Sequence, residues 1–157
     1  MKQYIGSKIV KAWPAMRFYR GPEFAPEYAE VGAIVPAGCA KVEDGYCVQY
    51  EDGYISWSPK AVFEEAYRET TGMSFGLAIE AMKKGLRVAR SGWNGKDMYV
   101  FLAYEADFVT DADLSAYDQL EVEVGDMLVM KTAQNTFQPG WLASQADMLA
   151  DDWYIVE

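Results

Sequence analysis

The sequence predicts an α+β fold made of two small modules, each a short antiparallel sheet with one or two short helices. Short runs of alternating aromatic and β-branched residues recur along the chain, separated by turn residues. Two helix-start signals, Ser58-Pro59 and Ser74, stand close together near the middle of the chain. The length of 157 residues suffices for one ordinary domain or two small ones.

The first module covers residues 1–70 and is expected to be rich in strands. A strand is predicted over 8–13 that stops at Pro14, because proline cannot donate to a sheet. A long loop follows over 21–38, where prolines and glycines are concentrated. A hairpin comes next, since alternating aromatic and β-branched residues flank an Asp-Gly turn at 52–53.

A helix is expected to close this module. Ser58 would cap the helix, with Pro59 in its first turn, and the helix would run to about Tyr67. Its apolar side chains fall on one stripe, as in a helix that packs on a sheet. Residues 68–72 are expected to form the boundary, so the second module occupies 71–157.

The second module is predicted to begin with a helix and to continue with short strands. Ser74 would cap the first helix and Gly85 would end it. Ser144 would cap a second, short helix over 145–150. Residues 105–125 are acidic and weakly patterned, so a long loop or insertion is expected there. Strands are expected over 87–90, 98–104, 127–131 and 153–156, with turns at 91–96 and 133–136.

Composition excludes several classes of function. The formal net charge is −10, and a chain of that charge is a poor partner for long nucleic acids. Histidine is absent, which removes the commonest general base and the commonest metal ligand. No apolar run approaches the roughly 20 residues that cross a bilayer, so no membrane association is expected. The chain is expected to act in the cytoplasm.

A first group of candidate binding residues lies in a local basic arc. Residues 81–96 hold five of the six basic side chains found after residue 70. Within the arc, Trp93 offers a flat ring for stacking on a base, Asn94 can hydrogen-bond a polar edge, and guanidinium groups suit phosphate. The alternative is that the Asn-Gly pair only makes a hairpin turn and that Trp93 is a core residue. The group consists of Arg87, Arg90, Trp93, Asn94 and Lys96.

A second group surrounds the predicted helix at 145–150. An N-cap serine leaves unpaired backbone amides that favour an anion, and a carboxylate nearby can accept from a ribose hydroxyl or a base amine. The alternative is that the serine only caps, the aspartate only complements the helix dipole and the tryptophan only packs. This group consists of Trp141, Ser144, Gln145, Asp147 and Met148.

Catalytic patterns are weaker than these binding patterns. The chain lacks a convincing nucleophile and base pair, a glycine-rich phosphate loop and a metal-ligand pattern. Adjacent carboxylates such as Asp151-Asp152 are expected to lie on the solvated surface. We therefore expect no catalytic residue, no metal, no cofactor and no enzyme activity.

Four stretches of the second module carry a family resemblance. MSFGLAIEAMKKG at 73–85 and VARSGWNGK at 88–96 resemble the start of the Thoeris anti-defense type 2 family. MKTA at 130–133 and GWLASQADMLADDW at 140–153 resemble its end. The likeness covers nearly all of residues 72–157 in the same order, whereas the first 70 residues, which look like a small module found on various phage proteins, lie outside it.

The resemblance implies a function. Family members are phage sponges that sequester cyclic ADP-ribose-type signals made by bacterial TIR-domain defence enzymes, and some also bind cyclic oligonucleotides. They form homo-oligomers, commonly tetramers, with ligand sites between subunits, so this chain would act in the cytoplasm of the infected host. By analogy, Trp93, Asn94 and Trp141 would contact the base, Ser144, Gln145, Asp147 and Met148 would line the site, and Arg90 would lie near the phosphates.

Two other functions stay open at this stage. The protein could be an enzyme that degrades the same signal. It could instead be a protein–protein inhibitor whose acidic face, especially around residues 105–126, occludes a host defence factor.

Overall fold

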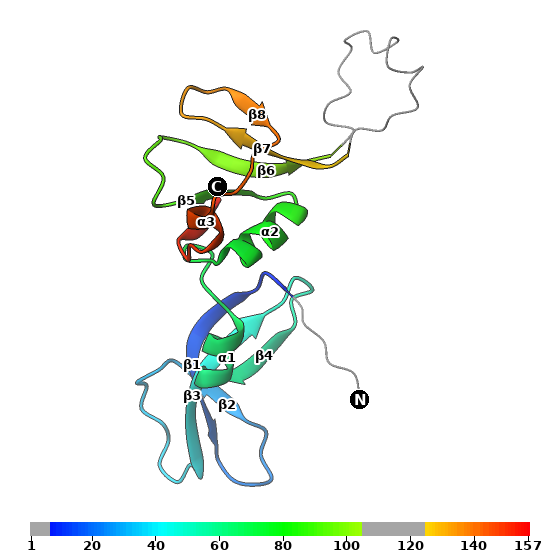
Figure 1. The fold of residues 1–157 in the computed structure, drawn as a ribbon. Coiled ribbons are helices and arrows are strands. Elements are labelled where there is room, and N and C mark those ends of the chain that lie inside the picture. The colour runs from blue at the N-terminus through cyan, green and yellow to red at the C-terminus, as the bar shows by residue number, and fades with distance from the viewer. Residues whose placement is uncertain (1–6, 105–124) are drawn as a thin grey trace. The chain divides into compact units, whose positions relative to one another are not determined.

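The structure is a computed structural model that describes residues 7–104 and 125–157. The chain divides into two units, Met1–Arg68 and Glu69–Glu157, each an antiparallel sheet with short helices (Figure 1). The predicted α+β class is confirmed. The insertion predicted over 105–125 lies, apart from its last residue, outside the described residues.

The first unit contains a four-stranded sheet in the order β2-β1-β3-β4, with every pair antiparallel. The predicted hairpin is confirmed as β3 and β4. Gly53 closes its turn with φ of 84°, a conformation that glycine adopts without strain, and the Tyr54 amide donates to the Asp52 carboxylate over 3.0 Å. The strands are β1 (Lys11–Tyr19), β2 (Glu27–Ala29), β3 (Lys41–Gln49) and β4 (Ile55–Pro59).

Two predictions for this sheet were wrong. β1 does not stop at Pro14 but continues to Tyr19, with Pro14 opposite Tyr46. Proline is tolerated there because β2 pairs only with residues 16–18, so among the described residues the Pro14 part of β1 has a neighbour strand on one side only. The expected loop over 21–38 contains the short strand β2.

The helix that closes the first unit is α1 (Lys60–Ala66). Ser58 does not cap it, because Ser58 belongs to β4 and Pro59 occupies the N-cap position. No residue of α1 is buried, and aromatic stacking attaches the helix to the sheet. The Phe63 ring lies between Tyr46, at 4.2 Å, and Tyr67, at 4.8 Å between centroids.

The second unit contains a five-stranded antiparallel sheet in the order β8-β7-β6-β5-β9. The four predicted strands are confirmed. A fifth strand was missed, because the turn at 133–136 closes a tight hairpin in which Asn135 has φ of 61°. The elements are α2 (Phe75–Lys83), β5 (Arg87–Arg90), β6 (Tyr99–Ala103), β7 (Met127–Lys131), β8 (Phe137–Pro139), α3 (Gln145–Met148) and β9 (Trp153–Val156).

Helix ends in this unit follow the predicted signals with small differences. Ser74 stands at the N-cap of α2, although its side chain makes no capping hydrogen bond. Gly85 ends that helix with φ of 80°, and its amide donates to the Met82 carbonyl over 2.9 Å. α3 is shorter than predicted, because Leu149 is already its C-cap.

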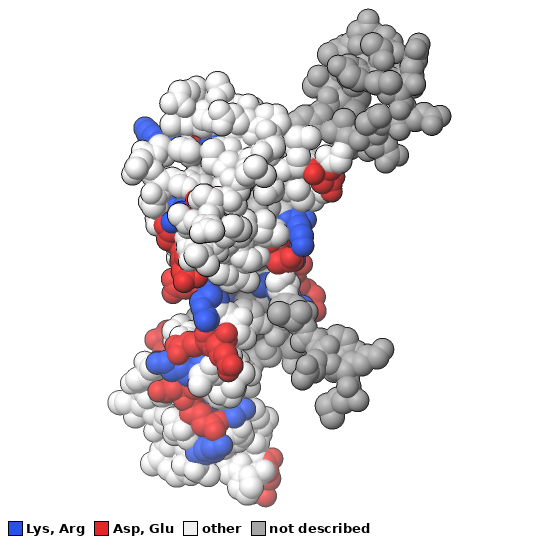
Figure 2. All heavy atoms as spheres, in the orientation of Figure 1, with Lys and Arg blue, Asp and Glu red and all other residues white. Residues whose placement is uncertain are grey.

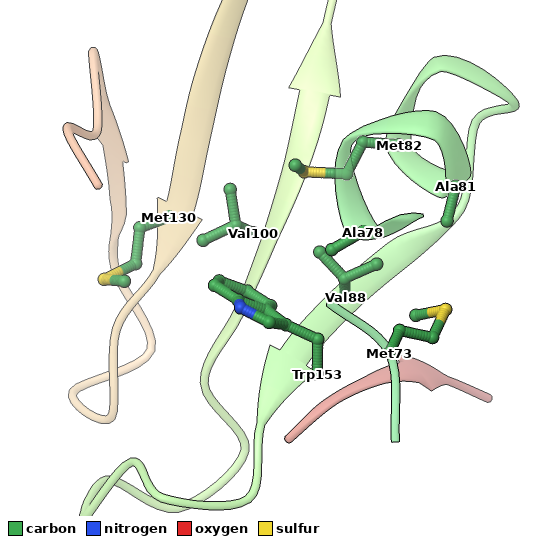
Figure 3. Packing of buried hydrophobic residues seen from close by; sticks show 8 residues of the cluster. All are labelled: Met73, Ala78, Ala81, Met82, Val88, Val100, Met130 and Trp153. Carbon is green, nitrogen blue, oxygen red and sulfur yellow. The ribbon is translucent and has the colours of Figure 1, made fainter. Parts of the chain in front are cut away.

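The core of the second unit lies between α2 and one face of the sheet. Strand alternation directs Val88, Val100 and Met130 to this face, where Ala78 and Met82 of α2 meet them. Figure 3 shows the indole of Trp153 among these side chains, and Trp153 is fully buried. The cluster consists of Met73, Ala78, Ala81, Met82, Val88, Val100, Met130 and Trp153.

β9, the C-terminal strand, joins the sheet beside β5. It pairs with β5 so that Arg90 lies opposite Trp153 and Arg87 opposite Val156. Two segments separated by about 60 residues in the sequence therefore become neighbours. The turn that leaves β5 lies beside the loop that enters β9, and the candidate residues meet there.

Truncating Met82, which is 1% exposed, tests this core. Met82→Ala is expected to lower the free energy of unfolding of the second unit by about 2–5 kcal/mol, because it removes buried surface and leaves a cavity. Urea unfolding followed by tryptophan fluorescence measures the change. Lys84→Ala is the control: Lys84 is an exposed residue at the C-terminal end of the same helix, and its truncation is expected to change the free energy of unfolding by no more than about 0.5 kcal/mol. Equal losses would contradict the assigned core.

Candidate ligand-binding site

Asp147 stands at the centre of the candidate site, in the first turn of α3. A capping box holds it there, since Ser144 is the N-cap and Asp147 the third residue of the helix. The amide and hydroxyl of Ser144 donate to Oδ2 of Asp147 over 3.0 and 2.6 Å, and the Asp147 amide donates to the Ser144 hydroxyl over 3.2 Å. The serine cap predicted from the sequence is confirmed.

The other carboxylate oxygen of Asp147 links α3 to the turn after β5. Oδ1 accepts from Nη1 of Arg90 over 2.8 Å and from the indole Nε1 of Trp93 over 3.0 Å. Asp147 is 9% exposed, so these donors replace the water that an ionised carboxylate would otherwise bind.

Asp152 completes the network from the loop before β9. Its Oδ1 accepts from Nε of Arg90 over 2.8 Å. Its Oδ2 accepts from the Ser91 hydroxyl over 3.2 Å and from the Gly92 amide over 2.8 Å. The Arg90 side chain is therefore held between two carboxylates, and it is 16% exposed.

These contacts set the charge state of the three groups. Burial would raise the pKa of Asp147, but hydrogen bonds from Ser144, Arg90 and Trp93 outweigh it and lower the pKa from 3.8 to about 2. The hydrogen bond from Arg90 lowers the pKa of Asp152, and the hydrogen bond to Asp152 is the main cause of a raised pKa at Arg90. At neutral pH the network thus holds one positive and two negative charges.

Three tryptophans form an aromatic cluster beside these carboxylates. Trp93 and Trp141 are half-buried, and their centroids lie 6.0 Å apart with an angle of 73° between the rings. The buried Trp153 contacts both rings edge to face, at 5.4 and 6.2 Å, and its Nε1 donates to the Asp147 carbonyl over 3.0 Å. The core thereby fixes the two half-buried indoles.

The structure brings five of the eight predicted site residues together, namely Arg90, Trp93, Trp141, Ser144 and Asp147. Asn94, Gln145 and Met148 are exposed, and their side chains make no hydrogen bond within the described part of the chain. They adjoin the network in sequence, so their roles as ligand contacts stay predictions. Arg87, from the same predicted basic arc, does not join the network: its guanidinium lies 5.1 Å from the Tyr99 ring centroid.

Sequence reasoning missed the part played by Asp152. The Asp151-Asp152 pair was predicted to lie on the solvated surface, which is wrong for Asp152: it is half-buried and paired with Arg90. The signal was the start of β9 at Trp153. Once β9 pairs with β5, the residue before Trp153 must lie beside the turn after Arg90. Trp153 was likewise predicted only as a strand residue.

Residues 7–104 and 125–157 contain no group of three carboxylate or cysteine side chains placed to hold a metal ion. Within the same ranges, no helix is long and apolar enough to cross a membrane.

Comparison with known proteins identifies the second unit. The family profile of the Thoeris anti-defense 2-like domain matches residues 73–156, more than half of the chain. The chain belongs to the Thoeris anti-defense 2-like family. A curated relative from Bacillus phage SP01, named Thoeris anti-defense 2, is 42% identical over 87 residues, which are 55% of this chain and 97% of the relative. The family resemblance found in the sequence is thus confirmed.

The match places the whole network inside the family domain. Arg90, Trp93, Asp147 and Asp152 all lie within residues 73–156. The relative from Bacillus phage SP01 is matched over nearly its full length by about half of this chain. The Thoeris anti-defense 2-like domain therefore corresponds to the second unit, and the first unit is an addition to it.

The lowered pKa of Asp147 predicts a stability change in acid. Because the pKa is lower in the folded protein, the unfolded chain binds the proton first, and stability is lost as pH falls from about 4 through about 2. The shift corresponds to about 2 kcal/mol. Asp147→Asn is expected to remove this part of the acid dependence of the free energy of unfolding, measured with urea at each pH.

The matched control for this titration is Asp151→Asn, which makes the same charge change at an exposed neighbour. It is expected to retain the wild-type acid dependence. Parallel curves for the wild type and Asp147→Asn would show that Asp147 is not held ionised by the network.

Proposed function

We propose that this protein is a phage anti-defense sponge that binds and sequesters glycocyclic ADP-ribose-type immune signals, leaving the downstream effector inactive. Family membership supports an anti-defense role, and the relative from Bacillus phage SP01 is a phage protein. We infer the ligand class from one arrangement: two half-buried indoles, Trp93 and Trp141, lie beside a buried carboxylate that accepts hydrogen bonds.

The two indoles suit a base or a ribose. The two rings meet edge to face at 73°, so they do not form a single flat surface. Trp153 packs against both, and Asp147 holds Trp93 by its ring nitrogen. A ligand then meets rings that are already fixed, which lowers the entropic cost of binding and favours slow release.

The polar groups of the site are assigned either to the ligand phosphates or to the base and its surroundings. Asp147 and Asp152 occupy most of the Arg90 guanidinium, the group that the family resemblance places close to the ligand phosphates. Its Nη2 makes no hydrogen bond within the described residues, and we assign this atom to a ligand phosphate. The exposed side chains of Asn94 and Gln145 are assigned to the base and its surroundings.

The state of the carboxylates supports capture without turnover. General acid–base catalysis works best when the pKa of the catalytic group lies near the working pH. The pKa of Asp147 is lowered to about 2, and that of Asp152 is lowered as well, so neither carboxylate is suited to proton transfer at neutral pH. We therefore propose that the protein is not an enzyme and uses no cofactor.

The proposal includes a homo-oligomer, with a tetramer favoured, acting in the cytoplasm of the infected host. Around α3 the second unit exposes apolar side chains beside the site: Leu142 is 88%, Leu149 83% and Met148 47% exposed. Figure 2 shows that most side chains on the visible face of the described second unit are uncharged, with charged side chains at its edges. Exposed apolar residues gathered in one region are typical of contacts between subunits. Cyclic oligonucleotides are proposed as a second ligand class.

Calorimetry with glycocyclic ADP-ribose tests the site. Trp93→Ala and Trp141→Ala are each expected to weaken binding by about 5- to 150-fold, the loss of about 1–3 kcal/mol of stacking. Trp13→Ala is the matched control, because Trp13 is 42% exposed and belongs to the first unit. The affinity of the Trp13→Ala variant for glycocyclic ADP-ribose is expected to equal that of the wild type.

Other outcomes would point elsewhere. Absence of wild-type binding would contradict the proposed ligand. Wild-type affinity in both site variants would contradict the proposed site. If the variants still block the defence system, while charge reversal within residues 105–126 abolishes the block, the protein is an inhibitor of a host protein instead.

A further inference from the structure

Asp152 holds the turn after β5 from its side chain and from its backbone. The carboxylate accepts from Nε of Arg90, from the Ser91 hydroxyl and from the Gly92 amide. The Asp152 carbonyl also accepts from the Ser91 amide over 3.2 Å. The last residue of β5 and the first two residues of the turn are thus attached to one residue of the loop before β9.

The short contact between the Asp152 carboxylate and the Gly92 amide is possible because residue 92 has no side chain. A Cβ atom at position 92 would lie 2.8 Å from Oδ2 of Asp152 and 3.3 Å from Nη2 of Arg90. A side chain there would push the carboxylate away from the Gly92 amide. The absence of a side chain at position 92 is therefore a condition for the contact with Asp152.

The position of this turn decides where Trp93 stands. Trp93 follows Gly92 directly, and its amide donates to the Arg90 carbonyl over 3.3 Å. Its indole reaches Oδ1 of Asp147 at 3.0 Å, a contact that depends on how far the turn lies from α3. Asn94 is the next residue along the same turn.

We propose that Asp152 is a positioning residue for the ligand site: through the Gly92 amide it fixes the turn that presents Trp93 and Asn94 to the ligand. The proposal rests on the proposed function, because it concerns the affinity of the same site. It differs from a purely structural role in β9, since the loss of Asp152 should disturb this turn and ligand affinity before it disturbs the core.

A double-mutant cycle on the full chain tests the coupling. Asp152→Ala and Gly92→Ala are each expected to weaken binding of glycocyclic ADP-ribose about tenfold, the loss of one charge-assisted hydrogen bond. The double variant is expected to lose clearly less than about a hundredfold, because both changes break the contact between the Asp152 carboxylate and the Gly92 amide, while Asp152→Ala also removes the contacts with Arg90 and Ser91. Asp151→Ala and Gly76→Ala are matched controls with unchanged affinity, because Asp151 is exposed and a Cβ at Gly76 meets nothing closer than 3.9 Å.

Amide exchange in the ligand-free protein separates this proposal from the proposed function. In Asp152→Ala, which removes the acceptor of the Gly92 amide, the Gly92 amide and the Trp93 indole N–H are expected to exchange faster, while the Val100 amide in the core keeps its protection. Additive losses in the cycle, or unchanged Gly92 and Trp93 exchange, would overturn the positioning role. If the wild type binds no ligand, the proposed function fails, and the exchange of Gly92 and Trp93 still decides whether Asp152 fixes the turn.

Discussion

The second unit depends on one buried carboxylate that stays ionised. Four hydrogen bonds, two from Ser144 and one each from Arg90 and Trp93, reach the two oxygens of Asp147. An unpaired charge at this depth would be costly, so the donors must be in place for the unit to fold as it does. Because these donors come from the start of α3 and from the turn after β5, a single side chain joins the two segments that form the candidate site.

The same interaction connects the site to the core. The carbonyl of Asp147 accepts from the fully buried Trp153, whose ring packs against Trp93 and Trp141. Movement of either half-buried indole would therefore disturb core packing or a hydrogen bond of Asp147. Such attachment would hold the proposed binding surface in place before a ligand arrives, which the proposed tight binding with slow release requires.

Local sequence signals predicted most helices and strands of this protein, whereas long-range strand pairing determines which residues meet at the candidate site. The serine cap at 144, the glycine stop at 85 and the strand at 153–156 were visible in the sequence, because each depends on a few adjacent residues. The strand through Pro14 and the short strand β8 were missed, since an edge position and a turn with positive φ decide them. No spacing in the sequence shows that Arg90 and Asp152 form a pair. That contact follows only from the register of β5 on β9.

Capture of the signal without turnover distinguishes a sponge from an enzyme. The two are separated by incubating the full chain with a known amount of glycocyclic ADP-ribose, removing free ligand, denaturing the protein by heat and chromatographing what is released. If the protein is a sponge, all bound ligand is recovered chemically intact, in a fixed ratio to protein. Recovery of a new product, increasing with incubation time, would show that the protein degrades its ligand and is not a sponge.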